Sequence, residues 1–323
     1  MVLLKEFEFH GPNFIRSKKL ISTDLITQTF ENQMNEPVRS IHKFDGASNN
    51  AVYKIETASN SYIFKIYVKR DWPEDGKLPF VVKKLSEYNV PHAKLFIFCR
   101  EDDNFPGGYL IEECLPGTTT DRLSLSCDET AKLFERLAET VSRVHRIKLS
   151  GFGYIGSGEA DYDTFSEHMY DVLTDNVPRL VETGALREVE AESVCAGLYE
   201  KLKPCDKFPS VLNHGDLSIK NVMVNSNGIT LIDWDDAHSL CWAADLARLT
   251  LWMKINYGAN EAALYRKVFM ESYETEHDKN FFSEAEDILH IWYGLDYLTF
   301  FTNGPVCEKV KSLVRESRKK CGI

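Results

Sequence analysis

Acidic and amide side chains are concentrated in the segment 211–235, which reads VLNHGDLSIKNVMVNSNGITLIDWD. Asp216 is followed five residues later by Asn221, and a further acid, Asp233, comes after a polar turn. In phosphoryl transfer, one carboxylate positions the attacking hydroxyl, while carboxylate and amide oxygens hold magnesium. We therefore interpret Asp216 as the catalytic residue and Asn221 with Asp233 as magnesium ligands.

The residues between the two expected metal ligands predict a β-hairpin. Two runs rich in β-branched residues, 222–224 and 229–232, flank the turn sequence Asn-Ser-Asn-Gly at 225–228. A tight hairpin would return Asp233 to Asn221. A turn capped by its own polar side chains would need no second acidic cluster after a hairpin, so a catalytic segment is the favoured interpretation.

The segment resembles the catalytic segment of the aminoglycoside phosphotransferase and choline kinase-like family of small-molecule kinases, which are relatives of protein kinases. Protein kinases carry His-Arg-Asp, an asparagine five residues after the aspartate, and then Asp-Phe-Gly. This chain has His214-Gly215-Asp216 and Asp233-Trp234-Asp235. The arginine of protein kinases commonly pairs with an activation-loop phosphate, so glycine in its place favours a kinase without that switch. His214 is expected to brace the loop through hydrogen bonds.

The resemblance implies an α+β, protein-kinase-like fold with two lobes. Residues 1–114 would form an N-terminal nucleotide-binding lobe of antiparallel sheet plus helix, with an extension at 1–38 that contains a helix from Ser22 to near Asn35. Residues 115–323 would form a mainly helical lobe that carries the catalytic hairpin and the acceptor site. ATP is the implied phosphate donor, with GTP as an alternative, and Mg²⁺ is the implied metal.

Elements of the first lobe can be predicted from the pattern of apolar residues. Alternation predicts strands in 39–57, on both sides of the turn-rich segment 45–50, and a third strand at 62–68. A helix is expected at 78–88. The segment 109–117 is typical of a strand that runs into a Pro-Gly break.

Nucleotide-binding positions follow from the resemblance. Family members grip the nucleotide phosphates with a lysine on the third strand, and an exposed lysine on an edge strand is the alternative interpretation. Backbone amides in a loop such as 45–50 can approach phosphates. The segment 109–117 resembles the hinge between the lobes, whose backbone would meet the adenine. The implied nucleotide-binding residues are Lys65, Gly46, Ser48, Asn50, Glu112 and Cys114.

One expected partner is missing from the nucleotide-binding lobe. Kinases usually pair the strand lysine with a glutamate on the following helix, but this chain has Leu78 or Phe80 at that position. This departure leaves a catalytically silent, kinase-like nucleotide-binding module as an alternative to an enzyme. The acids that could replace the glutamate are Glu74, Asp75 and Glu87.

From about residue 126 the apolar period changes from two to 3.6 residues, which is typical of helices. Asp245 matches an acid of the family that is expected to tie the loop around the catalytic segment. Further helices are predicted at about 164–182, 186–203, 243–257, 260–275 and 283–302. The side chains expected to line the acceptor pocket are Asp235, Asp236, Asp296 and Trp234.

The identity of the acceptor can be approached only through the second half. The Ser-Gly-Phe-Gly sequence at 150–153 resembles the segment after the first long helix in the hygromycin B phosphotransferase branch of the family, and the resemblance continues through 211–252 and 293–296. It implies an aminoglycoside-type antibiotic as the acceptor, and therefore antibiotic resistance. Choline, homoserine, hydroxylysine and sugar-like metabolites are the alternatives.

Composition narrows the function further. The 323 residues carry a net charge of −11, which disfavours nucleic acid as a partner and is compatible with a cationic substrate. Apolar runs are too short to span a membrane, and Lys5 and Glu6 interrupt any signal-peptide core. The eight cysteines have no zinc-like spacing and are expected to be reduced. We expect a cytoplasmic protein.

Overall fold

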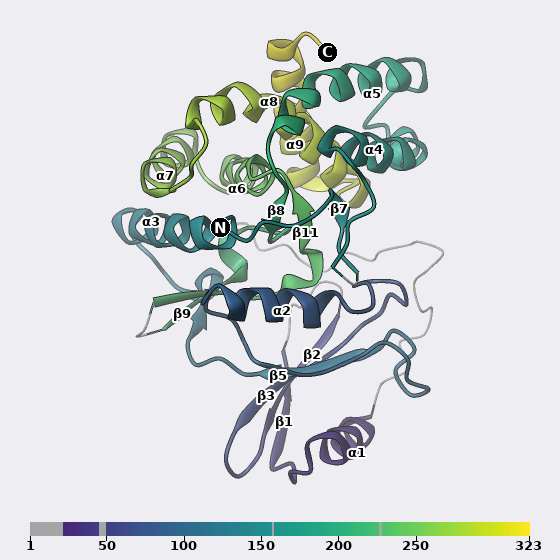
Figure 1. Cartoon of the computed structure of the whole chain (residues 1–323), viewed down its shortest axis with the longest axis vertical. Coiled ribbons are helices and arrows are strands. Elements are labelled where there is room, and N and C mark those ends of the chain that lie inside the picture. Colours follow the sequence, from purple (N-terminus) through teal and green to yellow (C-terminus); the bar gives the residue numbers. More distant parts are fainter. Residues whose placement is uncertain (1–21, 45–49, 157, 226–227) are drawn as a thin grey trace.

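The computed structural model describes residues 22–44, 50–156, 158–225 and 228–323. An antiparallel sheet with two helices forms one lobe, and helices dominate the other (Figure 1). This arrangement confirms the predicted α+β fold class with a sheet lobe before a helical lobe. No helix in the described part of the chain is both long and apolar enough to cross a membrane.

The first lobe contains a five-stranded antiparallel sheet with the strand order β1-β2-β3-β5-β4. Its strands are β1 (Ser40–Lys43), β2 (Ala51–Glu56), β3 (Ser61–Ile66), β4 (Leu95–Cys99) and β5 (Tyr109–Glu113). Strand β4 was not predicted, because a short apolar run without alternation does not distinguish a strand from a buried helical segment.

The two faces of this sheet are covered by different helices (Figure 1). Helix α1 (Thr23–Met34) packs on the face that carries Tyr62 and Phe64. Helix α2 (Lys77–Glu87) packs on the opposite face, which carries Tyr67. The core under α2 is continuous with the core of the helical lobe, whereas the core under α1 is separate.

Helix α1 begins and ends where the sequence predicted. The Ser22 hydroxyl accepts a hydrogen bond from the backbone N–H of Leu25 at 3.2 Å, and Asn35 ends the helix in the left-handed conformation with a φ of 54°. Phe30 is fully buried and lies edge-on to Tyr62, with ring centroids 5.1 Å apart. The described part of the N-terminal extension is therefore built into the first lobe.

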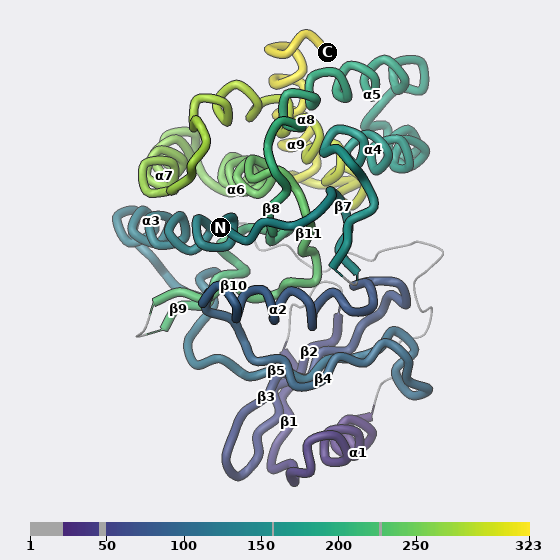
Figure 2. Tube along the Cα trace, viewed as in Figure 1, coloured from purple at the N-terminus to yellow at the C-terminus, as the bar shows by residue number. Residues whose placement is uncertain are grey.

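The second lobe consists mainly of helices, and Figure 2 shows how the chain passes between them. Helix α3 begins with a capping box formed by Ser126 and Glu129. The helices are α3 (Cys127–Val144), α4 (Phe165–Glu182), α5 (Glu188–Leu202), α6 (Ala243–Asn256), α7 (Ala259–Ser272), α8 (Lys279–Phe300) and α9 (Gly304–Cys321). Single 3₁₀ turns are η1 (Thr120–Arg122), η2 (Lys203–Lys207), η3 (Ile219–Asn221) and η4 (Trp234–Asp236).

Two small sheets lie at the boundary between the lobes and position the candidate site. One contains β6 (Thr118–Thr119), β9 (Val222–Asn225) and β10 (Gly228–Leu231). The other contains β7 (Gly153–Tyr154), β8 (Val211–Asn213) and β11 (His238–Leu240). Strands β9 and β10 pair antiparallel, which confirms the predicted hairpin.

Replacing Phe30 by alanine should destabilise the protein by about 3–5 kcal/mol, because the change leaves a cavity in the core between α1 and the sheet. Urea denaturation would measure the free energy of unfolding. Gln28→Ala, on the exposed side of the same helix, is the matched control. Equal stability of the two variants would show that α1 is not part of the folded lobe.

Candidate active site

The loop that carries Asp216 is fixed by a buried carboxylate on α6. Asp245 accepts hydrogen bonds from the backbone N–H groups of His214, at 2.6 Å, and Gly215, at 3.0 Å. Burial alone would raise the pKa of Asp245, but the hydrogen bond from His145 and the nearby His214 hold that pKa below its usual value. Asp245 thus ties the loop to α6, as the sequence predicted.

His145 and His214 support this loop from two sides. His145 Nδ1 lies 2.7 Å from the Tyr273 hydroxyl, and its Nε2 lies 3.4 Å from Asp245, so it is a satisfied core histidine. His214 Nδ1 accepts the backbone N–H of Asp216 at 3.3 Å, which leaves Nε2 to donate to the Ile232 carbonyl at 3.0 Å. His214 therefore braces the loop that carries Asp216 against the hairpin.

Gly215 occupies a position where a side chain does not fit. Its φ is +78°, and a Cβ there would overlap the carbonyl oxygen of Asp236. The glycine in the place of the protein-kinase arginine is therefore a steric requirement of this loop.

The hairpin brings Asn221 and Asp233 together, as expected. The backbone N–H of Ile232 donates to the carbonyl of Asn221 at 3.0 Å. The side-chain amide of Asn221 donates to the carbonyl and to Oδ2 of Asp216, both at 2.9 Å, which leaves its amide oxygen as a donor for a metal. Asp233 has a φ of +65°, in the left-handed region that aspartate tolerates better than most residues.

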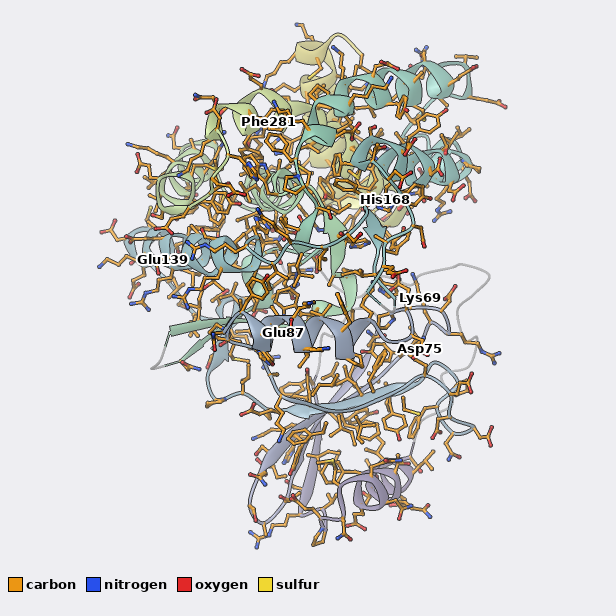
Figure 3. The ribbon with its side chains drawn as sticks, viewed as in Figure 1. Lys69, Asp75, Glu87, Glu139, His168 and Phe281 are labelled. Atoms are coloured by element: carbon orange, nitrogen blue, oxygen red, sulfur yellow. The ribbon has the colours of Figure 1, made fainter. Side chains whose placement is uncertain are left out.

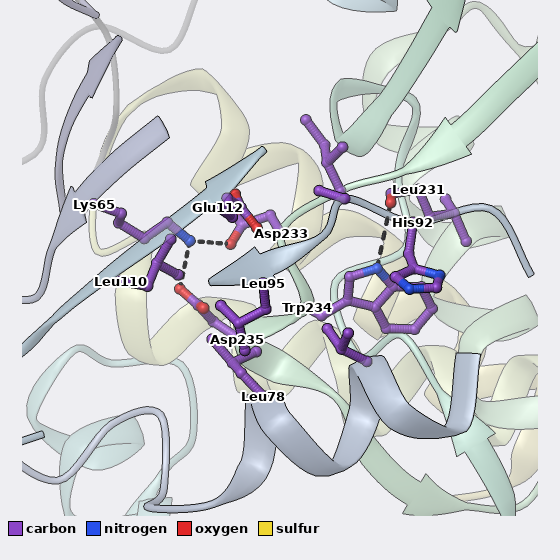
Figure 4. Close-up of a pocket in the computed structure, with 13 residues that line it drawn as sticks. Lys65, Leu78, His92, Leu95, Leu110, Glu112, Leu231, Asp233, Trp234 and Asp235 are labelled. Atoms are coloured by element: carbon purple, nitrogen blue, oxygen red, sulfur yellow. Dashed lines mark hydrogen bonds and ion pairs between the residues drawn. The ribbon is translucent and has the colours of Figure 1, made fainter. Parts of the chain in front are cut away.

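Lys65 lies beneath the hairpin, on the face of β3 that α2 covers. Its ammonium is 2.7 Å from Asp233 Oδ1 and 2.8 Å from Asp235 Oδ2 (Figure 4). Tyr67, on the same face, donates its hydroxyl to Asp235 Oδ1 at 3.0 Å. Burial lowers the pKa of Lys65, but the two carboxylates outweigh burial and hold it well above its usual value. Lys65 is thus a buried cation and not an exposed edge lysine.

The candidates for the missing helix glutamate do not pair with Lys65. Glu74 forms an ion pair with Lys77, the Asp75 side chain accepts the N–H of Gly76 at 3.0 Å, and Glu87 pairs with Lys84 at 2.9 Å. Asp75 and Glu87 lie at opposite ends of α2 (Figure 3). Acids of the hairpin segment pair with the strand lysine instead, so the predicted replacements were wrong.

Helix α2 contributes a buried lysine at its first position. Lys77 is fully buried, donates to the carbonyl of Asp235 at 3.2 Å and lies 3.7 Å from the ring of Trp72. Burial lowers the pKa of Lys77, against the effect of Glu74. The contact links α2 to the segment after Asp233, although sequence reasoning did not single out Lys77.

A pocket opens beside Lys65 and is drawn in Figure 4. Glu112 lines it together with apolar side chains of α2, β4 and β5, and burial raises the pKa of Glu112 to about 7 against the effect of Lys65. Cys114 is not among the lining residues, and its backbone N–H donates to the carbonyl of Ser61 at 3.1 Å. The N–H of Cys114 is therefore used in pairing with Ser61.

Several of the other predicted binding residues lie near Lys65 and Asp235. Asn50 Nδ2 lies 3.5 Å from Asp235 Oδ2, while Gly46 and Ser48 fall outside the described residues. Asp235 and Trp234, which were predicted to line the acceptor pocket, line the pocket beside Lys65. Trp234 packs on the ring of His214.

Two cations beside Asp216 were missed by sequence reasoning. Arg248 Nη2 donates to Asp216 Oδ1 at 3.0 Å, and Lys220 Nζ lies 3.5 Å from Asp216 Oδ2. Burial would raise the pKa of Asp216, but Lys220 and Arg248 hold it well below its usual value. Arg248 also lies 3.8 Å from Asp296. Arg248 shares α6 with the charged residues Asp245 and Lys254, so its residue type alone did not mark it as the partner of Asp216.

Comparison with known proteins places this chain in a family. The model of the phosphotransferase enzyme family, APH, matches residues 40–279. The chain therefore belongs to this family of phosphotransferases. A search of curated proteins found no match.

Solved structures share the fold at low sequence identity. A candidate fructosamine-3-kinase from Thermobifida fusca is 18% identical with a TM-score of 0.64, over 92% of this chain and 100% of that chain. A thermostable mutant of the aminoglycoside phosphotransferase APH(4)-Ia, in complex with AMP-PNP and hygromycin B, is 16% identical with a TM-score of 0.65, over 92% and 96%. A candidate fructosamine-3-kinase from Haemophilus somnus is 13% identical with a TM-score of 0.66, over 90% and 96%.

Glu112→Gln should reduce the pH dependence of stability between about pH 4.5 and 7. The folded-state pKa of Glu112 is raised to about 7 from 4.5, so the folded protein keeps a proton that the unfolded chain loses. The free energy of unfolding therefore falls as pH rises through this window. Urea denaturation at pH 5 and pH 8 should show a relative gain for the variant at pH 8, and Glu135→Gln, exposed on α3, is the control. A variant that differs from the wild type equally at both pH values would contradict the pKa shift.

Proposed function

We propose that this protein transfers the γ-phosphate of ATP to a hydroxyl group of a small molecule, with Mg²⁺ as the metal. The proposal is carried by one connected network: Asn221 bonds Asp216, the hairpin joins Asn221 to Asp233, and Asp233 bonds Lys65. A hydroxyl-positioning carboxylate, two metal donors and a phosphate-binding cation are the groups that phosphoryl transfer needs. Membership of a phosphotransferase family supports the same reaction class.

Asp216 would orient the acceptor hydroxyl and take its proton as the phosphate is transferred. The low pKa of this carboxyl keeps it ionised at neutral pH, so it can accept a hydrogen bond from the hydroxyl before the phosphate is transferred. The same low pKa makes it a weak base. We therefore assign Asp216 mainly to positioning the hydroxyl. It would accept the hydroxyl proton only as the bond to phosphorus forms.

The donor atoms at the hairpin fit magnesium. The Asn221 amide oxygen and the Asp233 carboxylate are hard oxygen donors, and the two amide hydrogens of Asn221 are directed to Asp216. In the described part of the chain no three His, Cys, Asp or Glu side chains form a closed metal site, which agrees with a metal shared with nucleotide phosphates. When bound, Mg²⁺ would neutralise charge on those phosphates.

Lys65 would contact the nucleotide phosphates from the floor of the pocket. Its ammonium is paired with Asp233 and Asp235 in the structure, and both carboxylates lie at the pocket lining. Leu78, Leu95 and Leu110 supply apolar lining on the same side, which suits a planar base.

For the acceptor, the resemblance in the second half favours an aminoglycoside such as hygromycin B. Solved neighbours include an enzyme bound to hygromycin B and candidate fructosamine-3-kinases, which are similar to this chain in fold. A coupled assay of nucleotide consumption over aminoglycosides, fructosamines and small hydroxy metabolites tests the proposal. ATP and Mg²⁺ binding without phosphate transfer to any of them would instead favour a silent binding module.

Asp216→Asn should lower kcat by about 10²–10⁴-fold for any acceptor that the wild-type protein phosphorylates, because the amide cannot accept the hydroxyl proton. Binding of ATP with Mg²⁺, followed by thermal shift, should be largely retained. Asp103→Asn, at an exposed position of the first lobe, is the control. Wild-type turnover of Asp216→Asn would remove the assignment of the catalytic residue.

Asp233→Asn should raise the Mg²⁺ concentration needed for half-maximal rate by about 10–100-fold, because one of the two protein donors loses its charge. Asp235→Asn is a strict comparison, since it also removes one ion pair of Lys65 but no proposed metal ligand. Initial rates at fixed ATP and varied Mg²⁺ measure the effect. An equal shift in both variants would mean that the loss of the lysine pair, and not of a metal donor, is responsible.

A further inference from the structure

Arg248 is the more enclosed of the two cations that contact Asp216. Its side chain is 14% exposed and comes from the interior of α6. It lies beside Tyr293 and Tyr297 of α8, with its guanidinium carbon 5.7 Å and 5.1 Å from the two ring centroids. Helices α6 and α8 therefore hold this guanidinium in place next to the catalytic carboxylate.

The guanidinium has more donors than the surrounding residues use. Among the described residues, Arg248 donates one hydrogen bond, to Asp216, and its Nε is buried without a partner. Its contact with Asp296 is an ion pair at 3.8 Å, beyond hydrogen-bond distance. Within the part of the chain that the structure describes, Nη1 makes no hydrogen bond either, so a ligand oxygen that reaches this guanidinium would gain affinity.

Lys220 extends the positive charge towards solvent. Its ammonium lies on the other oxygen of Asp216, and its side chain is 47% exposed. An acceptor whose hydroxyl reaches Asp216 must therefore approach between two cations. An ammonium group of the acceptor at this position would be repelled by both, whereas a carboxylate could bind both.

We propose that the acceptor is a hydroxy acid, whose carboxylate is bound by Arg248 and Lys220 while its hydroxyl lies at Asp216. This inference rests on the proposed kinase function and narrows its substrate class. A monoanion suits the site better than a dianionic phosphate ester, because Asp296 and the half-buried Asp236 lie near Arg248 and repel additional negative charge.

A purely structural role for Arg248 predicts a different result. If Arg248 only held Asp216 in place, its loss would lower turnover of all acceptors by the same factor. If Arg248 binds a carboxylate, its loss removes the preference for an acid over the matching uncharged amide. The ratio of kcat/KM for acid and amide separates the two roles, because any effect on Asp216 cancels in that ratio.

The experiment uses the full chain with ATP and Mg²⁺ and matched pairs of acceptors. Each pair differs only in the conversion of a carboxylate to an amide: homoserine and homoserinamide, gluconate and gluconamide, glycerate and glyceramide, and fructosylglycine and fructosylglycinamide. Glycerol 3-phosphate is the dianionic probe and hygromycin B the polycationic one. At least one acid should be phosphorylated with a kcat/KM ten or more times that of its amide and of both other probes.

Arg248→Gln should then lower the acid-to-amide ratio at least tenfold, mainly through the KM of the acid, and Arg248→Lys should restore part of it. Arg146→Gln is the matched control, because the Arg146 side chain is 62% exposed and lies just beyond the C-terminal end of α3. Lys220→Gln should lower the ratio by a smaller factor, and this exposed position provides the test if Arg248→Gln does not fold.

The outcomes distinguish the two proposals. Phosphorylation of amides or hygromycin B at least as efficiently as acids would overturn the inference and leave the kinase function standing. An unchanged acid-to-amide ratio in Arg248→Gln, or in Lys220→Gln where only that variant folds, would also overturn it. If ATP and Mg²⁺ bind but no acceptor of any class is phosphorylated, the kinase function fails, and the inference fails with it.

Discussion

The buried carboxylate of Asp245 is the interaction on which the geometry of the site depends. A charge buried this deeply is tolerated only when it is fully hydrogen-bonded, and here the partners are backbone N–H groups of the catalytic loop together with His145. The requirement works in both directions: α6 needs the loop to satisfy its acid, and the loop obtains a fixed position relative to α6. Arg248, one turn further along α6, is thereby placed against Asp216.

A second set of charges connects the sheet to the hairpin. Lys65 reaches Asp233 and Asp235 from β3, and Lys77 reaches the backbone of Asp235 from α2. Both lysines are buried, so their partners are required for the folded state and are not optional surface pairs. The hairpin segment thus serves as the common partner of the strand and the helix, and it takes over the role that a helix glutamate has in protein kinases.

Local patterns in the sequence predicted local structure well, and pairings between distant residues poorly. The hairpin, the α1 caps and the face of β3 that carries Lys65 could be read from short periodicities and turn residues. The two partners of Lys65, Asp233 and Asp235, lie 168 and 170 residues away along the chain. No pattern within one element encodes such a pairing. Arg248 shares its helix with other charged residues and so was not marked as the partner of Asp216, and the pairing of the Cys114 N–H with Ser61 depends on the register of β3 and β5.

The continuous core beneath α2 has a consequence for motion. Leu78 and Val81 of α2 belong to the same apolar cluster as Phe134 and Leu137 of α3. A wide opening of the two lobes would therefore expose apolar surface to water, at a free-energy cost of about 25 cal/mol per Å². The separate cluster under α1 would meanwhile travel intact with the sheet. We expect ligands to enter and leave through small relative movements of the lobes, because the apolar contact under α2 restrains their separation.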